Sequence, residues 1–153
     1  MSADTKLHRT ALVVAGIGLL DSLYLSWVKI VNSQVFCGTS GQCETVNNSP
    51  YSEIGGVPIA YLGLGAYLVI LGLLFLEMRS PFWKETSPIA HFGISLVGVI
   101  YSAYLTYIEI AVLHAICPYC VVSAIAMLLL FIIAIIRLLQ VQTGSKPIPS
   151  RGG

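Results

Sequence analysis

The chain has 153 residues, of which 56% are hydrophobic and 10% are charged, and its formal net charge is +1. A soluble domain carries about 25% charged residues, so this composition, with a mean hydropathy of +0.84, excludes an ordinary soluble fold. Nucleic-acid binding is excluded too, because a near-neutral chain has no basic stripe to neutralise phosphates. The length fits a single domain.

Four long apolar segments follow one another along the chain, at residues 10–30, 57–76, 89–113 and 117–139. Each is close to the ~20 residues that a helix needs to cross a membrane. They are too long and too continuous for the strands of a membrane barrel. We therefore predict an all-α integral membrane four-helix bundle over residues 1–143, followed by a disordered tail at 144–153.

The basic residues predict how these helices are oriented. Lys6 and Arg9 precede the first segment, which continues past Asp21 without a cleavage site and is expected to stay as a signal-anchor. Further Lys and Arg residues occupy the second connection and the tail, whereas the loop 31–56 has none. The positive-inside rule then places both termini in the cytoplasm and the loop outside the cell inner or plasma membrane.

The first and third segments resemble each other at an offset of 80 residues. The matching or similar pairs are Gly18/Gly98, Ser22/Ser102, Tyr24/Tyr104, Leu25/Leu105, Ser26/Thr106 and Ile30/Ile110, and the same offset aligns Cys37 with Cys117. We interpret the similarity as two parallel helix hairpins, each bringing a cysteine to the outer face. Coincidence between two amphiphilic membrane helices is the alternative.

All four cysteines fall on the outer side of this topology, in a compartment where disulfides persist. Cys117 and Cys120 form a CxxC motif at the start of the fourth segment. Pro118 suits the first position of a helix. The helix N-terminus should lower the pKa of the Cys117 thiol and favour the thiolate that attacks disulfides.

The loop pair, Cys37 and Cys43, is separated by a glycine-containing stretch that lets the sulfurs bond to each other or reach a third one. Redox exchange, a four-thiolate zinc site and two structural disulfides are all conceivable. The spacings are not a common zinc pattern, and a CxxC disulfide closes too short a loop to be a good staple. We therefore favour thiol–disulfide exchange.

Nearly the whole chain resembles the vitamin K epoxide reductase family, in its bacterial and archaeal branch but without a fused thioredoxin domain. The resemblance rests on the stretches LLDSLYLS at 19–26, CETVNNSPY at 43–51, GVPI at 56–59 and CPYC at 117–120. The loop pair comes first and the CxxC late, as in this family. Unrelated quinone reductases of the DsbB type have the opposite order and are the second hypothesis.

The resemblance implies a quinone-dependent thiol–disulfide oxidoreductase that supports disulfide bond formation. Electrons from a separate thioredoxin-like (DsbA-like) exported protein would enter at Cys37 and Cys43 and pass to Cys117 and Cys120. Ubiquinone or menaquinone, held among the helices, would accept them, with no metal involved. Ser49 matches a Ser or Thr of the family that is expected near the quinone head group. A non-catalytic membrane scaffold with structural disulfides is the hypothesis from a different class.

Four other residues are candidates for the quinone site. The animal enzymes carry Asn and Tyr where this chain has Ile59 and Ala124, which favours a quinone over vitamin K epoxide. Asp21, in mid-membrane, is either a proton donor or pocket-ordering group or, as we favour, a hydrogen-bonded packing residue. Tyr119 belongs to a group of outer aromatic residues, most of which should form the interfacial belt.

Three residues near the outer interface have two interpretations each. Lys29 and Glu109 occupy equivalent repeat positions and could pair, or Lys29 could reach lipid head groups. His114 precedes Cys117 by three residues. As a cation it would lower the pKa of that thiol, and otherwise it is an interfacial aromatic residue.

Overall fold

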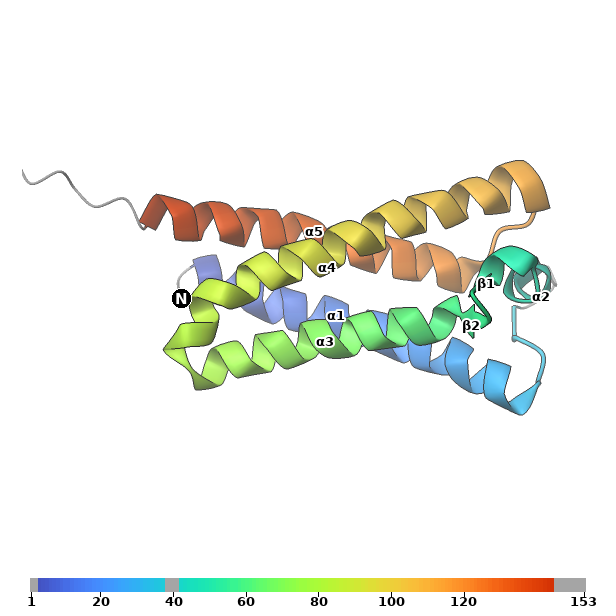
Figure 1. Cartoon of the computed structure of the whole chain (residues 1–153), viewed down its shortest axis with the longest axis horizontal. Helices are drawn as coiled ribbons and strands as arrows, with labels where there is room; N and C mark the ends of the chain where they lie inside the picture. Colours follow the sequence, from blue (N-terminus) through green and yellow to red (C-terminus); the bar gives the residue numbers. More distant parts are fainter. Residues whose placement is uncertain (1–2, 38–41, 145–153) are drawn as a thin grey trace, which may run out of the picture.

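The protein is a bundle of four long helices, described here by a computed structural model that covers residues 3–37 and 42–144. The elements, in chain order, are α1 (Ala3–Val31), α2 (Gln42–Asn47), a 3₁₀ turn (Pro50–Ser52), β1 (Glu53–Ile54), β2 (Val57–Pro58), α3 (Ile59–Arg79), α4 (Pro81–Ile108), a π-helical turn η2 (Glu109–Leu113) and α5 (Pro118–Gly144). The long helices lie side by side (Figure 1). Helices α1 and α4 each pack against both α3 and α5. The predicted all-α four-helix fold is thus confirmed. The expected disordered tail lies outside the described residues, apart from Gly144, which ends α5.

The four long helices are each long and apolar enough to cross a membrane, over Thr5–Val31, Ile59–Arg79, Pro81–Leu113 and Pro118–Gly144. Large apolar side chains cover their outer faces; Leu20 and Val97, for example, are each 67% exposed. In water such surfaces would drive aggregation, but lipid solvates them. The protein is therefore a multi-pass membrane protein.

The helices extend beyond the apolar segments that predicted them. Helix α1 begins at Ala3 rather than near residue 10, and α4 begins at Pro81 rather than near residue 89. The difference arises because hydropathy marks the part of a helix that lies in hydrocarbon, whereas the backbone hydrogen bonds continue into polar residues at its ends. Pro81 and Pro118 each take the first position of a helix, where no backbone donor is needed.

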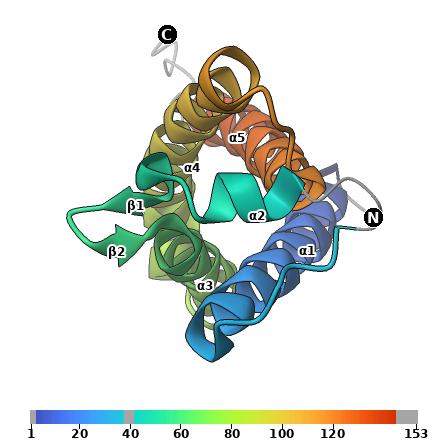
Figure 2. The same cartoon turned by 90° about the vertical axis from the view of Figure 1, so that its right-hand side faces the viewer.

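Between α1 and α3 the chain forms a small cap over one end of the bundle. Helix α2 crosses this end above the space between the long helices (Figure 2). A hairpin follows, in which Ile54 pairs with Val57, so that Gly55 and Gly56 form a two-residue turn. Both glycines have positive φ angles, 58° and 83°, and such turns favour glycine because a side chain would be strained there.

The interior consists of two buried apolar clusters. One occupies the middle of the bundle and includes Tyr67, Ile70, Leu74 and Leu130, none of which has exposed surface. The other lies at the capped end and includes Leu25, Val28, Val35, Cys43, Val46, Ala115 and Cys117. The second cluster therefore joins the cap to the helix ends and contains cysteines from both pairs.

The repeated glycines mark the points of close approach between helices. A Cβ atom on Gly18 of α1 would overlap the ring of Tyr67 on α3, and one on Gly98 of α4 would overlap Met127 on α5. Absence of a side chain at both positions lets the two helices of each pair come together. In both similar segments, the glycine thus allows the helix to pack closely against a neighbouring helix.

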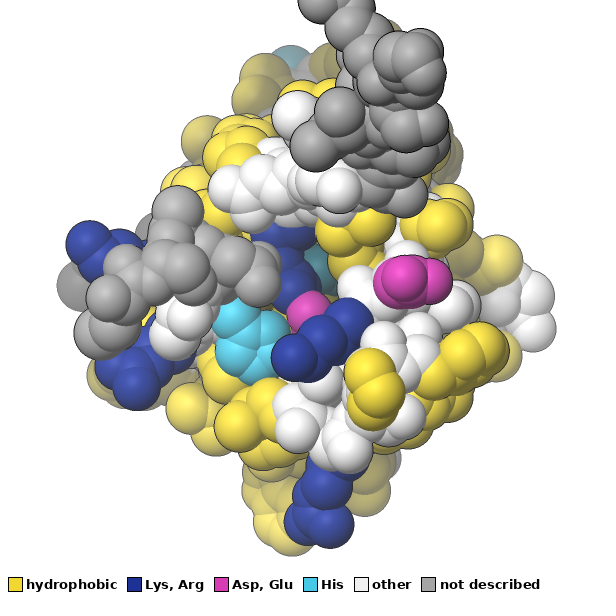
Figure 3. Space-filling view, turned by 90° about the vertical axis from the view of Figure 1, so that its left-hand side faces the viewer, with side chains coloured by type: hydrophobic (Ala, Val, Ile, Leu, Met, Phe, Trp, Pro, Cys, Tyr) yellow, Lys and Arg dark blue, Asp and Glu magenta, His cyan; other side chains and the backbone are white. Residues whose placement is uncertain are grey.

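At the end away from the cysteines, the four helices meet around one buried carboxylate. Glu77 of α3 forms an ion pair with Arg137 of α5, and both side chains are buried. The hydroxyl of Ser87 on α4 donates to Glu77 Oε2 at 3.4 Å, and Nδ1 of His8 on α1 lies 3.8 Å from the same oxygen. Figure 3 shows acidic, basic and histidine side chains meeting near the middle of this end. The ion pair ties the helices together on the side opposite to the cap.

Candidate active site

The loop cysteines form a disulfide at the cap. Cys37 and Cys43 are bonded, with their Cα atoms 6.0 Å apart. Cys43 is the second residue of α2 and has no exposed surface, whereas Cys37 is half-buried. Lys29 of α1 holds the cap in place, because its Nζ donates to the Asn47 carbonyl at 2.9 Å and lies 3.3 Å from Glu53 Oε1. The suggested pairing of Lys29 with Glu109 is therefore wrong.

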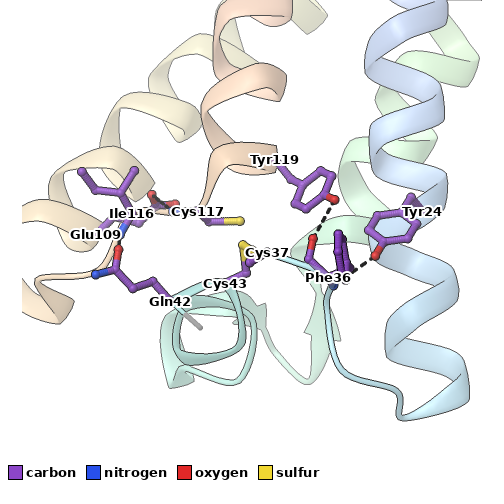
Figure 4. Close-up of a disulfide and its surroundings, with 9 residues drawn as sticks. All are labelled: Tyr24, Phe36, Cys37, Gln42, Cys43, Glu109, Ile116, Cys117 and Tyr119. Carbon is purple, nitrogen blue, oxygen red and sulfur yellow. Dashed lines mark hydrogen bonds between the residues drawn. A yellow bond between two sulfur atoms is a disulfide. The ribbon is translucent and has the colours of Figure 1, made fainter. Parts of the chain in front are cut away.

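The CxxC pair stands opposite this disulfide, at the start of α5. Cys117 and Cys120 are thiols in the described structure, and Cys117 is 2% exposed. Cys117 lies in the same buried cluster as Cys43, with Cys37 and Cys120 packed against it. Figure 4 shows the sulfur of Cys117 directed toward the sulfurs of the loop disulfide. The structure thus brings all four cysteines together at one end of the bundle.

The electrostatic environment of Cys117 favours its thiolate. The hydrogen bond from the Cys120 thiol lowers the pKa of Cys117, because a hydrogen bond donated to a thiolate stabilises the charged form. Backbone N–H groups of Tyr119 and Cys120, in the first turn of α5, act in the same direction. Cys117 is therefore suited to be the attacking thiol of the pair. His114 is exposed and ends the π-helical turn in a left-handed conformation.

Two side chains hold the segment that leads into the CxxC. Glu109 Oε2 accepts a hydrogen bond from the backbone N–H of Cys117 at 3.2 Å, and Gln42 of α2 accepts one from the backbone N–H of Ile116, also at 3.2 Å. Gln42 is adjacent to Cys43, so the loop helix is fastened directly to the chain that carries Cys117. Figure 4 shows both contacts.

The residue before Cys37 is held by two tyrosines from different helices. The backbone N–H of Phe36 donates to the Tyr24 hydroxyl at 3.2 Å, and the Tyr119 hydroxyl donates to the Phe36 carbonyl at 2.9 Å. The two tyrosine rings contact each other, with centroids 5.1 Å apart. The side chain of Phe36 is 79% exposed. The backbone leading into Cys37 is thus fixed while an apolar side chain is displayed beside it.

A cavity of about 630 Å³ opens among the four helices below the CxxC pair. Its lining is mainly apolar and includes Asp21, Ser49, Ile59, Cys117 and Cys120 of the predicted site residues. Ala124 and Tyr119 do not line it, and Tyr119 instead supports Phe36. Among the described residues, Asp21 Oδ2 is buried and has no hydrogen-bond partner. The cavity thus reaches both cysteines of the CxxC pair.

Sequence reasoning missed two of these arrangements. The contact of Glu109 with the CxxC segment depends on the π-helical turn, which rotates residues 109–113 relative to a regular helix. A carboxylate in an apolar segment eight residues before a CxxC was the signal that could have revealed it. The clamp on Phe36 joins residues of α1, the loop and α5, and no local pattern predicts it.

No group of three or more His, Cys, Asp or Glu side chains in residues 3–37 and 42–144 is arranged to hold a metal ion.

Two cysteine pairs that face each other above an apolar cavity, in a bundle of membrane-spanning helices, define a membrane redox protein that works through thiols and disulfides.

The sequence comparisons agree with this class. The profile of the vitamin K epoxide reductase family matches residues 9–135, and the chain belongs to that family. It is also similar to the thiol-disulfide oxidoreductase LTO1 of Arabidopsis thaliana, with 32% identity over 164 aligned positions. The alignment covers 88% of this chain and 44% of that relative, so the chain spans less than half of the relative's length. Family membership confirms the predicted resemblance and takes the place of the DsbB-type hypothesis.

Proposed function

We propose that the protein passes electrons from a thioredoxin-like exported protein to a quinone, through its two cysteine pairs. The observation that carries the proposal is the position of Cys117. It shares a buried cluster with the loop disulfide, and it also lines the apolar cavity. A CxxC pair between a disulfide and a cavity can receive electrons from the first and release them into the second.

The difference in burial supports separate tasks for the two loop cysteines. Cys37 is partly exposed, whereas Cys43 is fully buried against Cys117. A partner thiolate would attack Cys37, form a mixed disulfide and release Cys43 as a thiolate. A second partner thiol then closes the partner's own disulfide and leaves Cys37 reduced. Cys43 attacks Cys117 of an oxidised CxxC pair, and the loop disulfide re-forms as Cys117 and Cys120 become thiols. Each exchange breaks one S–S bond and forms one, so the electron pair is conserved.

The cavity fits a quinone ring as the final acceptor. Its volume of about 630 Å³ lies in the range of small-molecule sites, roughly 300–1,000 Å³. Cys120 and Ser49 both line it. The Ser49 hydroxyl donates to the Val46 carbonyl at 2.8 Å, so its lone pairs remain able to accept a hydrogen bond from a quinol. Two thiols and one quinone give one disulfide and one quinol, without any other reactant.

The distribution of basic residues supports an exoplasmic position for the cysteines. Lys6, Arg9, Arg79 and Lys84 lie near the end of the bundle that holds the N-terminus and the turn between α3 and α4. At the cysteine end, Lys29 is engaged by Glu53. By the positive-inside rule the termini face the cytoplasm, and the cap faces the oxidising side of the cell inner or plasma membrane.

Reconstituted protein tests the electron path. Supplied with a reduced DsbA-type protein and ubiquinone-1, it should form one quinol for each partner disulfide, as followed by quinone absorbance and partner thiol content. Cys120→Ala should stop quinol formation while the helical content is retained. Gly16→Ala is the matched control, because a Cβ at Gly16 meets no atom within 4 Å. A Cys120→Ala protein with unchanged turnover would show that the cysteines act only as a scaffold, and an inactive wild type would refute the proposed acceptor or partner.

Double variants test the order of exchange. Cys37→Ser with Cys120→Ser leaves Cys43 and Cys117, which should form a disulfide detectable by mass spectrometry. Cys43→Ser with Cys120→Ser leaves Cys37 and Cys117 and should form far less. The reverse result would exchange the roles of the two loop cysteines.

A further inference from the structure

In the described structure, Glu109 is the one carboxylate that contacts the CxxC pair. The exchange steps proposed above use only the cysteines and give Glu109 no role. Glu109 is 3% exposed and is the first residue of the π-helical turn η2. Oε2 accepts the backbone N–H of Cys117 at 3.2 Å. The carboxylate and Cys120 both line the same cavity. Glu109 therefore contacts the redox pair and the proposed quinone site at once.

The surroundings of Glu109 contain no compensating cation. Among the described residues, no Lys, Arg or His lies within ion-pair distance of its carboxylate; Lys29, on α1, is engaged by Glu53. Helix α2, which packs against η2, carries Glu44, and that side chain is exposed. The titratable groups that face Glu109 are thus the thiols of Cys117 and Cys120. A buried carboxylate without a cation is costly unless hydrogen bonds replace its hydration.

We propose that Glu109 is the catalytic proton acceptor for Cys120. When Cys120 reacts, its S–H bond breaks and an O–H bond forms on Glu109, so that one negative charge moves from oxygen to sulfur. This proton transfer leaves the number of buried charges unchanged.

The role of Glu109 in quinone reduction rests on the proposed function. All electrons and protons of that reaction are accounted for. Cys117 and Cys120 together lose two electrons and two protons as the S–S bond between them forms. A quinone takes up both electrons and both protons and becomes a quinol. Glu109 holds the Cys120 proton in the interval and returns it to a quinone oxygen, which restores the carboxylate. Its position in the cavity wall allows this return without a path through water.

Alkylation of Cys120 tests the proton acceptor without any quinone. Fully reduced protein is treated with iodoacetamide at a series of pH values from about 5.5 to about 9, a range that extends to both sides of the ordinary thiol pKa of about 8.5. Modification of Cys120 is followed by mass spectrometry. If Glu109 takes the proton, the rate should show a pH-independent plateau near neutral pH, because proton transfer within the pair changes no net charge. In Glu109→Gln the plateau should vanish, and the rate should rise about tenfold per pH unit. Glu109→Asp should keep part of the plateau.

Single-turnover oxidation by ubiquinone-1 supplies the second readout. Loss of a proton acceptor typically slows a step by on the order of a hundredfold, so Glu109→Gln should react about that much more slowly than the wild type. Glu44→Gln, the same substitution on an exposed residue of α2 at the same end, is the matched control. It should leave both readouts unchanged.

Each outcome has a definite meaning. A wild-type alkylation rate that rises with pH without a plateau would overturn the proposal, even if the Glu109 variants fail to fold. The same conclusion follows if Glu109→Gln behaves like the wild type in both assays. A plateau that depends on Glu109, found together with no quinone reduction by the wild type, would retain the proton acceptor and refute the proposed quinone.

Discussion

Replacement of Glu77 by Gln should weaken the whole bundle, because it removes one partner of a buried ion pair that joins all four helices. Glu77 and Arg137 are 6% and 4% exposed. Removing the carboxylate from such a buried pair typically costs about 3–5 kcal/mol, because the guanidinium loses the opposite charge that faces it. The contacts of Glu77 with Ser87 and His8 weaken as well. Because these residues lie at the end of the bundle opposite to the cysteines, we expect unchanged thiol reactivity in the folded fraction.

The free energy of unfolding can be measured by titration with a denaturing detergent and followed by circular dichroism. Glu85→Gln is the matched control, since Glu85 is exposed at the same end, and it should shift stability by less than about 0.5 kcal/mol. A double variant with leucine at both Glu77 and Arg137 should recover most of the loss, because apolar replacements of a buried pair are often neutral. A Glu77→Gln protein as stable as the Glu85→Gln control would refute the reasoning.

Two further predictions concern α1 and the CxxC pair. Gly18→Ala should destabilise the bundle by about 1–3 kcal/mol, because the new methyl group displaces Tyr67 from its hydrogen bonds to Ser123. Gly16→Ala is the control on the same helix, because a Cβ there meets no atom within 4 Å. It should be neutral or stabilising in the same unfolding assay. In a protein without the loop cysteines, Cys120→Ala should raise the pKa of Cys117 and move its alkylation profile to higher pH, because the hydrogen bond that lowers this pKa is lost. Cys120→Ser keeps a donor and should give a smaller shift, and equal shifts in the two variants would contradict that cause.

The long helices and the N-terminus of α5 could be predicted from the sequence because the signals are local. An apolar run of membrane-spanning length specifies a helix, and Pro118 marks the start of one. Hydropathy does not specify which side of a helix faces its neighbours, since lipid and the bundle interior are both apolar. For this reason the sequence could predict that Cys117 and Cys120 lie at the same end of the bundle as the loop pair, but not that Glu109 lies against the CxxC segment.

The polar contacts at the two ends escaped prediction for a related reason. Arg137 reads as one of several charges after the fourth apolar segment, and its ion pair with Glu77 joins residues that are 60 positions apart. The cap is also formed by distant partners, such as Lys29 with Glu53. These pairings depend on the three-dimensional arrangement of the helices. Gly18 and Gly98 are an intermediate case, because the repeat singled them out but the residues they face, Tyr67 and Met127, come only from the structure.

The tyrosine clamp on Phe36 has a consequence for the kinetics of exchange. Because Tyr24 and Tyr119 fix the backbone just before Cys37, opening of the loop disulfide does not release that end of the loop into solution. The reduced loop cysteines then stay at high effective concentration relative to the CxxC pair. Under the proposed function, exchange inside the protein is then a unimolecular event, and turnover at low partner concentration should be limited by how often the partner meets the exposed Phe36 and Cys37 in a productive orientation.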